Sequence, residues 1–209
     1  MSPSSLSSQG KGTSTPRIAS INRETSETQV NLTINLDGTG QSSVATGSGF
    51  LDHMLTLASA HGFFDLSLAA QGDTHVDLHH LVEDVGISMG QAVDQALGDR
   101  AGIRRFANVA LPMDEALVSA ALDISGRSCL VFNVPLERDK VGELDTEVIE
   151  EFFAAFARNA RVTLHFNLLY GRNTHHILEA VFKAFGRVLG EAASLDPRRA
   201  GVPSTKGII

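Results

Sequence analysis

Two stretches of the chain carry the same helical pattern of hydrophobic positions. The apolar residues are Val82, Val85, Met89, Ala92 and Val93 in the first stretch and Leu178, Val181, Phe185, Val188 and Leu189 in the second. Steps of three and four residues place such side chains on one buried helix face. Each pattern begins with a His-His pair and a glutamate, HHLVE at 79–83 and HHILE at 175–179, in the same register. The sequence therefore predicts a duplicated helix.

Alternating hydrophobic positions predict strands before each of these helices. In the first half, residues 30–36 alternate and the turn residues 37–40 follow, which predicts a strand and a hairpin. Asp52 is a candidate N-cap for a short helix that ends near Gly62, and a strand is expected at 63–70. In the second half, strands are expected at 117–122, 129–134 and 162–169. Thr146 is expected to cap a helix with an apolar face.

Each half thus has the predicted order strand, strand, helix, strand, helix. Two such halves predict an α+β fold made of internally duplicated βαβ-type half-domains, in which two sheets pack with helices. Residues 1–16 are rich in Ser, Gly and Thr and are expected to form a disordered tail. We expect the first repeat at 17–100 and the second at 101–209. We expect the two repeats to form one catalytic unit, with a C-terminal segment that folds over its site as a substrate loop.

The composition narrows the class of protein. A chain of 209 residues that is 43% hydrophobic can bury a substantial core. The net charge of -7 and the absence of a basic run argue against a nucleic-acid partner. The chain has one cysteine and no apolar run of about 18 residues, so neither a disulfide framework nor a membrane span is expected. A cytoplasmic protein is the simplest interpretation.

The His-His-x-x-Glu motifs predict metal binding. His79 and Glu83 are separated by one helical turn, as are His175 and Glu179, so each pair can share a cation. Adjacent histidines such as His79 and His80 diverge by about 100° around a helix. Each member of a pair therefore suits a different ion. Imidazole together with carboxylate is suitable for Mn, Fe, Co, Ni or Zn.

The duplication points to two further ligands. His53 lies on the short helix that precedes the first His-His helix, where a structural role is an equally simple interpretation. The corresponding place in the second half is occupied by Glu151, with Glu150 beside it as the fallback. Imidazoles and carboxylates in these numbers are sufficient for two sites that keep positions open for catalysis.

Basic residues supply a candidate phosphate site. Arg104 and Arg105 follow a glycine, Arg127 follows another, and Lys206 lies near the C-terminal end of the sequence given. Lys183 lies two turns after His175 on nearly the same helix face. Arg and Lys together with backbone amides are the usual phosphate-binding groups.

The successive motifs together resemble one known family. GSGFLDHML, DLHHLVEDVGI, PMDEAL, LDISGR, YGRNTHHILEAVFKAFGRVL and GVPSTKG are similar, in order, to those of imidazoleglycerol-phosphate dehydratase. The resemblance runs from about residue 17 to residue 209. It implies Mn²⁺-dependent dehydration of imidazole glycerol phosphate to imidazole acetol phosphate, a step of histidine biosynthesis. It also implies two Mn²⁺ ions per active site at subunit boundaries in a homo-oligomer of about 24 subunits.

The same resemblance assigns roles to residues of this chain. The implied metal ligands are His53, His79, His80, Glu83, Glu151, His175, His176 and Glu179. The implied contacts to substrate and its phosphate are Arg105, Arg127, Lys183, Thr205 and Lys206. Glu27 and His61 are implied near the glycerol carbons, and we expect one of them to transfer protons.

The chain departs from the family pattern at three positions. It has Glu151 where the family usually has histidine, Gly49 where proline is usual, and Leu81 where a polar residue is usual. A carboxylate is acceptable to Mn²⁺, so Glu151 stays among the expected ligands. Two other functions remain open from the sequence: a two-cation phosphoesterase and a non-catalytic metal-binding or scaffold protein.

Overall fold

The structure is a computed structural model that describes residues 16–209. The predicted disordered tail therefore lies outside the described residues, apart from Pro16. Throughout the described part of the chain, no helix has the length and apolar character that crossing a membrane requires.

The two halves of the chain form elements in the same order, except that the second half has an additional pair of short strands before its first helix. The first half contains β1 (Ile18–Glu24), β2 (Thr28–Asn35), β3 (Ser42–Ala45), α1 (Gly49–Gly62), β4 (Asp65–Gly72) and α2 (His79–Leu97). The second half contains β5 (Phe106–Met113), β6 (Ala116–Asp123), β7 (Cys129–Asn133), β8 (Lys140–Val141), β9 (Leu144–Asp145), α3 (Val148–Ala160), β10 (Thr163–Tyr170) and α4 (Thr174–Ala193). The prediction of a duplicated α+β fold is thereby confirmed.

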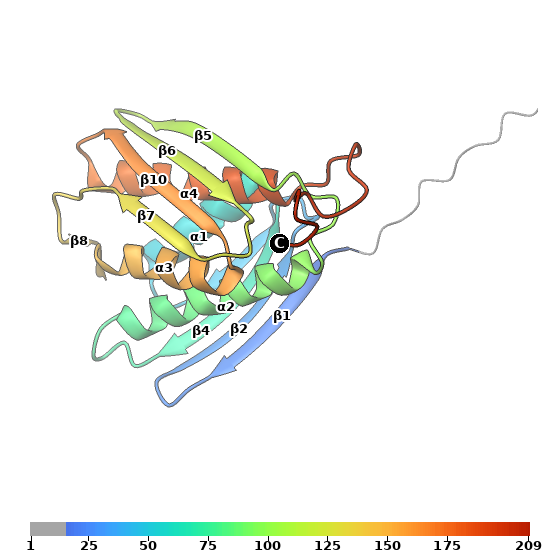
Figure 1. Ribbon diagram of the computed structural model, residues 1–209. Coiled ribbons are helices and arrows are strands. Elements are labelled where there is room, and N and C mark those ends of the chain that lie inside the picture. Colours follow the sequence, from blue (N-terminus) through green and yellow to red (C-terminus); the bar gives the residue numbers. More distant parts are fainter. Residues whose placement is uncertain (1–15) are drawn as a thin grey trace, which may run out of the picture.

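The elements form four layers, with helices between two sheets (Figure 1). The strand orders are β1-β2-β4-β3 and β5-β6-β10-β7, so the sheets have matching topologies. In each sheet the third strand of its half runs parallel to the strand that follows the first helix of that half, β3 with β4 and β7 with β10. Helix α2 packs on α3 and helix α1 on α4, which joins the two halves through their helices.

The sequence misplaced one hairpin. The turn residues 37–40 do not lead into a hairpin, because the following strand β3 pairs with β4 and not with β2. The hairpin is formed by β1 and β2, which pair antiparallel from Ile18 with Asn35 to Glu24 with Gln29. Alternation of side chains identifies a strand but not its neighbour, and β4 comes between β2 and β3.

Two predicted helix caps were also wrong. Ser48 occupies the N-cap position of α1, and Asp52 lies in the first turn, where it accepts hydrogen bonds from the amide and hydroxyl of Thr46 at 2.8 and 2.6 Å. Glu147 occupies the N-cap position of α3, and the hydroxyl of Thr146 donates to the carbonyl of Arg138. Both side chains hold an adjoining loop against the helix start.

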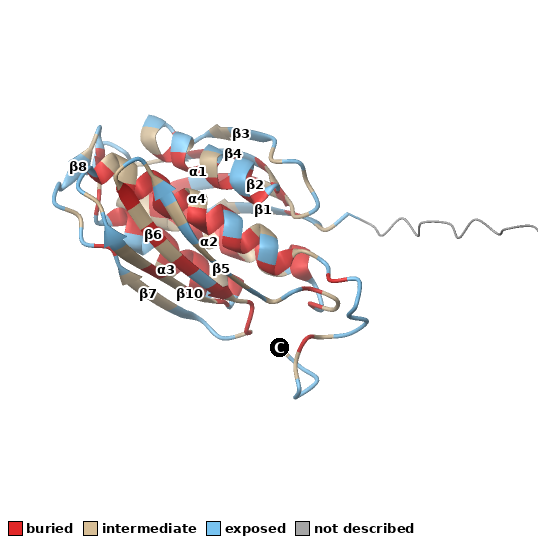
Figure 2. Ribbon diagram, turned by 90° about the horizontal axis from the view of Figure 1, so that it is seen from above, coloured by how far each residue is buried: buried red, intermediate tan, exposed pale blue. Residues whose placement is uncertain are grey.

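The core lies between the sheets, on the inner faces of the four helices (Figure 2). The helices approach closely where glycine stands at the crossing. A Cβ on Gly186 of α4 would lie 2.1 Å from the carbonyl oxygen of Ala58 on α1, so no larger residue fits. Leu81, one of the departures from the family pattern, is 1% exposed and belongs to this core.

Candidate metal centre

The start of helix α4 presents the second His-His pair. The side chain of Asn173 caps this helix, accepting hydrogen bonds from the amides of His175 and His176 at 3.0 and 3.4 Å. The cap satisfies amides that have no partner inside the helix. The two imidazole planes are inclined by 86°, so the rings face different directions. This divergence agrees with the expectation that adjacent histidines serve different sites.

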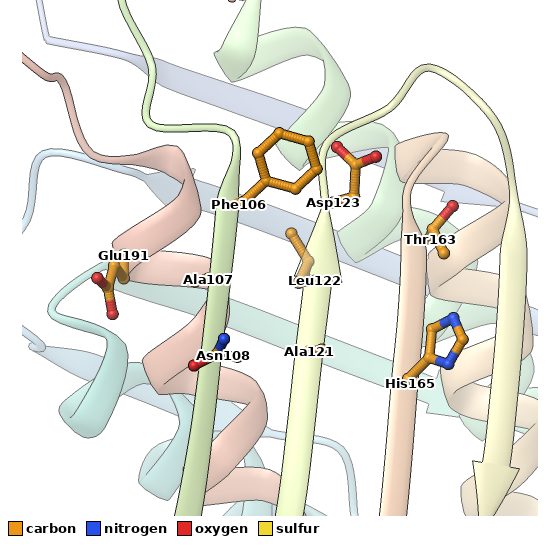
Figure 3. A pocket seen from close by; sticks show the side chains of 9 residues that line it. All are labelled: Phe106, Ala107, Asn108, Ala121, Leu122, Asp123, Thr163, His165 and Glu191. Carbon is orange, nitrogen blue, oxygen red and sulfur yellow. The ribbon is translucent and has the colours of Figure 1, made fainter.

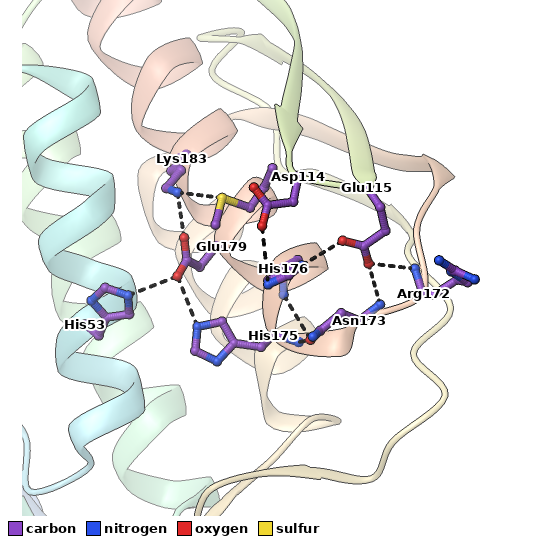
Figure 4. Close-up of polar contacts among 10 residues, drawn as sticks. His53, Asp114, Glu115, Arg172, Asn173, His175, His176, Glu179 and Lys183 are labelled. Carbon is purple, nitrogen blue, oxygen red and sulfur yellow. Dashed lines mark hydrogen bonds and ion pairs between the residues drawn. The ribbon is translucent and has the colours of Figure 1, made fainter.

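His53, His175 and Glu179 converge at one point, and we call them the His53 group (Figure 4). The Nε2 atoms of His53 and His175 lie 3.2 and 3.0 Å from the same carboxylate oxygen, Oε1 of Glu179. One ligand atom from each residue lies within 4.8 Å of the other two. Two imidazole nitrogens and one carboxylate oxygen form a donor set that suits Mn²⁺ and other first-row divalent cations.

Glu179 is the buried member of this group and remains ionised. Its burial alone would raise the pKa, but hydrogen bonds from Lys183, His53 and His175 lower the pKa of Glu179 to about 2. Lys183 donates to Oε2 at 2.5 Å, one turn further along α4. The group therefore offers a carboxylate that is deprotonated at neutral pH, as metal binding requires.

His176 faces away from the His53 group and has its own acidic partner. Its Nδ1 lies 2.7 Å from Oε2 of Glu115, in the loop between β5 and β6. The hydrogen bond to His176 and the backbone amide of Asn173 lower the pKa of Glu115 to about 2, and the same bond raises the pKa of His176. An ionised carboxylate only accepts, so Nδ1 carries the hydrogen. Nε2 of the neutral ring, which lies 3.8 Å from Oδ2 of Asp114, is then the atom that can bind a metal.

His80 also lies beside acidic residues, in the first half of the chain. We call His80, Asp73 and Glu27 the His80 group. Nδ1 of His80 lies 3.1 Å from Asp73 and 3.8 Å from Glu27, and these three residues form the second set of potential metal ligands among residues 16–209. The hydrogen bond to Asp73 raises the pKa of His80. Asp73 plays the same part toward His80 as Glu115 plays toward His176.

The remaining predicted ligands are not gathered into either group within the described chain. His79 and Glu83 lie on the first turns of α2, and the ring of His79 is 6.3 Å from that of His80. Glu151 is exposed in the first turn of α3, next to Glu150. One copy of the chain thus distributes the eight expected ligands over the starts of several helices.

The expected substrate residues divide between two ends of the molecule. Lys183 contacts Sδ of Met113, at one end of β5. Arg105 directly precedes the other end, where it binds Asp123 at 2.7 Å and donates to the carbonyl of Pro203. The eight-residue strand rises about 3.4 Å per residue, so these ends are roughly 25 Å apart.

The C-terminal segment lies at the Arg105 end, on the side of the molecule away from β8 (Figure 1). A Cβ on Gly126 would lie 2.7 Å from the carbonyl carbon of Ile209, so this segment packs against the turn that carries Arg127. Thr205 and Lys206 are exposed on the same segment. Arg105, Arg127, Thr205 and Lys206 therefore form one neighbourhood.

His61 lines a cavity of about 570 Å³ between α1 and α4, together with Arg104 and Arg187. Partial burial lowers the pKa of His61, and the charges of Lys183 and Arg187 lower it further. His61 is thus a neutral imidazole at physiological pH. A separate groove of about 430 Å³ on the outer face of the second sheet contains none of the expected site residues (Figure 3).

Two residues of the site were missed from the sequence. Neither Asp73 nor Glu115 was assigned a role from the sequence, although Glu115 lies in the PMDEAL motif. Each is close to its histidine only because a loop of the sheet folds against a helix start. The sequence signal that could have indicated them is an acidic residue in a predicted loop before each His-His motif.

Comparison with known proteins identifies the family. The family model described as Imidazoleglycerol-phosphate dehydratase matches residues 46–189. A relative of that name from Oceanobacillus iheyensis is 58% identical over 191 residues, which cover 91% of this chain and 98% of the relative. The chain belongs to the imidazoleglycerol-phosphate dehydratase family. The predictions of this family and of a hydro-lyase are confirmed.

Solved structures of the imidazoleglycerol-phosphate dehydratase family have the same fold. The enzyme from Staphylococcus aureus is 44% identical with a TM-score of 0.78, and the match covers 86% of this chain and 99% of that one. The enzyme from Pyrococcus furiosus is 34% identical with the same TM-score, and the match covers 90% of this chain and 100% of that one. These similarities favour neither the phosphoesterase nor the scaffold alternative.

Proposed function

We propose that this chain catalyses the Mn²⁺-dependent dehydration of imidazole glycerol phosphate to imidazole acetol phosphate, with two ions per active site. It acts in the cytoplasm as a homo-oligomer of about 24 subunits, with its sites at subunit boundaries. The observation that carries the proposal is the His53 group: two imidazole nitrogens converge on an ionised carboxylate at the start of a duplicated His-His helix.

The donor atoms fit the proposed cation. The His53 group supplies nitrogen and oxygen donors, and the Nδ1 hydrogen bonds of His80 and His176 to carboxylates leave Nε2 as the metal-binding atom of each ring. Carboxylates that bind the second ring nitrogen of a ligating histidine are common in metal sites, where they fix the tautomer and the ring direction. Three protein donors leave coordination positions for a substrate.

The division of the site residues supports an active site made by more than one copy. The His53 group and Lys183 lie at one end of β5, and the residues around Arg105 lie at the other end. A small phosphorylated substrate cannot span roughly 25 Å. Lys206 and Arg105 of one copy would therefore complete the site at which another copy contributes His175 and Glu179.

Each group of residues has a task in the reaction. Loss of water removes a hydroxyl group from the carbon beside the imidazole ring and a proton from the next carbon, and the resulting enol becomes the ketone. A bound cation supplies Lewis acidity that stabilises negative charge developing on the ring. The basic residues hold the phosphate and so fix the position of the reacting carbons. Glu27 or neutral His61 accepts the proton.

The proposal is tested by removing metal with a chelator and adding Mn²⁺ back, with turnover of imidazole glycerol phosphate and metal content per subunit recorded together. We expect turnover to fall with the metal and to return with about two ions per subunit. Release of inorganic phosphate is measured in the same samples. Turnover that is unaffected by full metal removal, or phosphate release in place of dehydration, would refute the proposal.

A further inference from the structure

Asp84 is a buried carboxylate on α2, one helical turn after His80, and none of the roles above uses it. Its Oδ1 accepts a hydrogen bond from Nε of Arg23 at 2.8 Å. Its Oδ2 accepts a short hydrogen bond from the hydroxyl of Thr28. Burial of a charge is costly unless the charge is paired, so these two partners account for how Asp84 is tolerated.

The hydroxyl of Thr28 begins a chain of hydrogen bonds with a fixed direction. Because its hydrogen points to the Asp84 carboxylate, Thr28 Oγ1 must accept from the hydroxyl of Thr25, 3.1 Å away. Thr25 Oγ1 in turn accepts the amides of Glu27 at 3.2 Å and Thr28 at 2.9 Å. A charge at one end polarises such a chain and strengthens each bond along it.

This chain of hydrogen bonds ends at Glu27, the hairpin residue that lies beside His80. The carbonyl of Glu27 accepts the amide of Asp73 at 3.1 Å, and Oε2 of Glu27 lies 3.8 Å from Nδ1 of His80. Asp84 and His80 are on the same face of α2 because they are one turn apart. The β1–β2 hairpin is thus attached to the helix that carries the first His-His pair, directly behind Glu27.

The second half has the same fold without this carboxylate. The residue one turn after His176 is Ala180, which is fully buried. There the β5–β6 hairpin is attached through its own acid: Glu115 binds His176 and also the amides of Arg172 and Asn173. In the first half the threonine hydroxyls hold the hairpin, and the side chain of Glu27 stays 52% exposed.

We propose that Asp84 is a positioning residue, which holds Glu27 at the metal-binding end of α2 through the hydroxyls of Thr28 and Thr25. This inference rests on the proposed function, in which the Glu27 carboxylate acts near the reacting carbons. The fold does not require the arrangement, since the second half forms without it. The hydrogen bonds from Asp84 through Thr28 and Thr25 hold the hairpin in place without engaging the Glu27 carboxylate.

Three variants separate positioning from general stability. Thr28→Val has nearly the same shape and breaks the hydroxyl chain, but it leaves the pair of Arg23 with Asp84. Thr28→Ser restores the hydroxyl. Arg23→Gln removes the ion pair and leaves the hydroxyl chain, so it is the matched control. If Thr28→Val does not fold, Thr25→Val breaks the same chain at an exposed residue.

Metal-loaded protein is assayed for kcat and KM, for Mn²⁺ per subunit, and for hydrogen exchange of the Glu27 and Thr28 amides. Thr28→Val is expected to lower kcat about tenfold at unchanged metal content and to speed exchange of both amides. A loss of this size is typical when a residue that supports a site residue from behind is removed. Thr28→Ser is expected to recover the wild-type kcat and the slow amide exchange, and Arg23→Gln is expected to retain them.

Wild-type kcat and amide protection in Thr28→Val would overturn the inference, as would equal losses in Arg23→Gln. The proposed function fails separately, by absence of turnover in the metal-loaded wild-type protein. In that case amide exchange still tests whether the hydroxyl chain holds the hairpin, because this measurement does not depend on activity.

Discussion

At the scale of single residues, the orientation and charge of each proposed ligand depend on the residues that bind its other polar atoms. Asp73 and Glu115 each bind Nδ1 of a histidine, so that Nε2 is the ring nitrogen that can bind a metal. Glu179 combines burial with three hydrogen-bond donors and stays ionised. These partners come from other elements of the fold, and for that reason a motif alone identifies a ligand without its orientation.

Glu151 occupies the position at which the resemblance implies a histidine ligand, and we propose that its carboxylate binds metal. We expect Glu151→Gln to reduce bound Mn²⁺ from about two ions per subunit toward one, because an amide is a weaker donor than a carboxylate. Metal content after dialysis against a weak chelator measures the loss. Glu150→Gln is the control, since Glu150 is equally exposed beside it. Unchanged metal content in Glu151→Gln would remove Glu151 from the ligands, and a loss confined to Glu150→Gln would assign the ligand to Glu150.

His61 is expected to control the acid limb of the pH profile. A histidine with a lowered pKa is neutral and able to accept a proton down to a pH below the ordinary 6.5. Activity should therefore be kept at pH 6.5 and fall at lower pH. Arg187→Gln removes a positive charge that lowers this pKa, so the acid limb should move to higher pH.

These expectations are checked by measuring kcat against pH for the wild-type protein and Arg187→Gln, and also for His61→Asn and Glu27→Gln. Loss of turnover in one of them assigns the proton transfer to that residue. Near-normal turnover in both, or an acid limb that Arg187→Gln does not move, would contradict these roles.

At the scale of elements, the site depends on how closely the helices cross. Helix α1 carries His53 and helix α4 carries His175 and Glu179, so the His53 group exists only because these helices are in contact. The contact is permitted by glycine at the crossing. The cap at Asn173 then fixes where α4 begins, and with it the direction of both histidines.

Gly186→Ala should separate α1 from α4. The added methyl group would lie 2.1 Å from the Ala58 carbonyl oxygen, and an overpacked contact of this kind costs about 1–3 kcal/mol in the free energy of unfolding. We also expect weaker metal binding, because His53 moves away from Glu179. Thermal unfolding and metal content measure the two effects.

The matched control is Gly49→Ala, at the first residue of α1, where no atom lies within 4 Å of the added Cβ. A lowered unfolding temperature in both variants to the same extent would show that close approach is not the cause.

At the scale of the whole molecule, the residues proposed to bind phosphate at Arg105 and the residues proposed to bind metal lie at opposite ends of strand β5 within one copy. If one site draws on two copies, two different inactive variants should complement each other. Arg105→Ala and Glu179→Gln, dissociated and reassembled together, are expected to regain turnover, because some sites then combine intact residues from both.

The control mixture is Lys183→Ala with Glu179→Gln. Lys183 and Glu179 contact each other within one copy, so every site in this mixture lacks one of them. Turnover restored in both mixtures, or in neither, would contradict an active site shared in this way.

The sequence alone determined the duplication, the family and the type of chemistry. Local patterns were sufficient for this, because helical and strand periodicities and the His-His-x-x-Glu spacing depend only on residues close together in the chain. The two helices that begin at the His-His pairs followed in the same way. The hairpin at 37–40 failed because strand pairing is a long-range property, decided here by the insertion of β4 between β2 and β3.

The tertiary structure decided which ligands meet. It brought His53 to Glu179 across two helices, placed Asp73 and Glu115 behind their histidines, and joined Asp84 to the Glu27 hairpin. It also separated Lys183 from Arg105 by the length of a strand. These relations depend on helix crossings and loop positions, which are set by packing over the whole core and leave no periodic signal in the sequence.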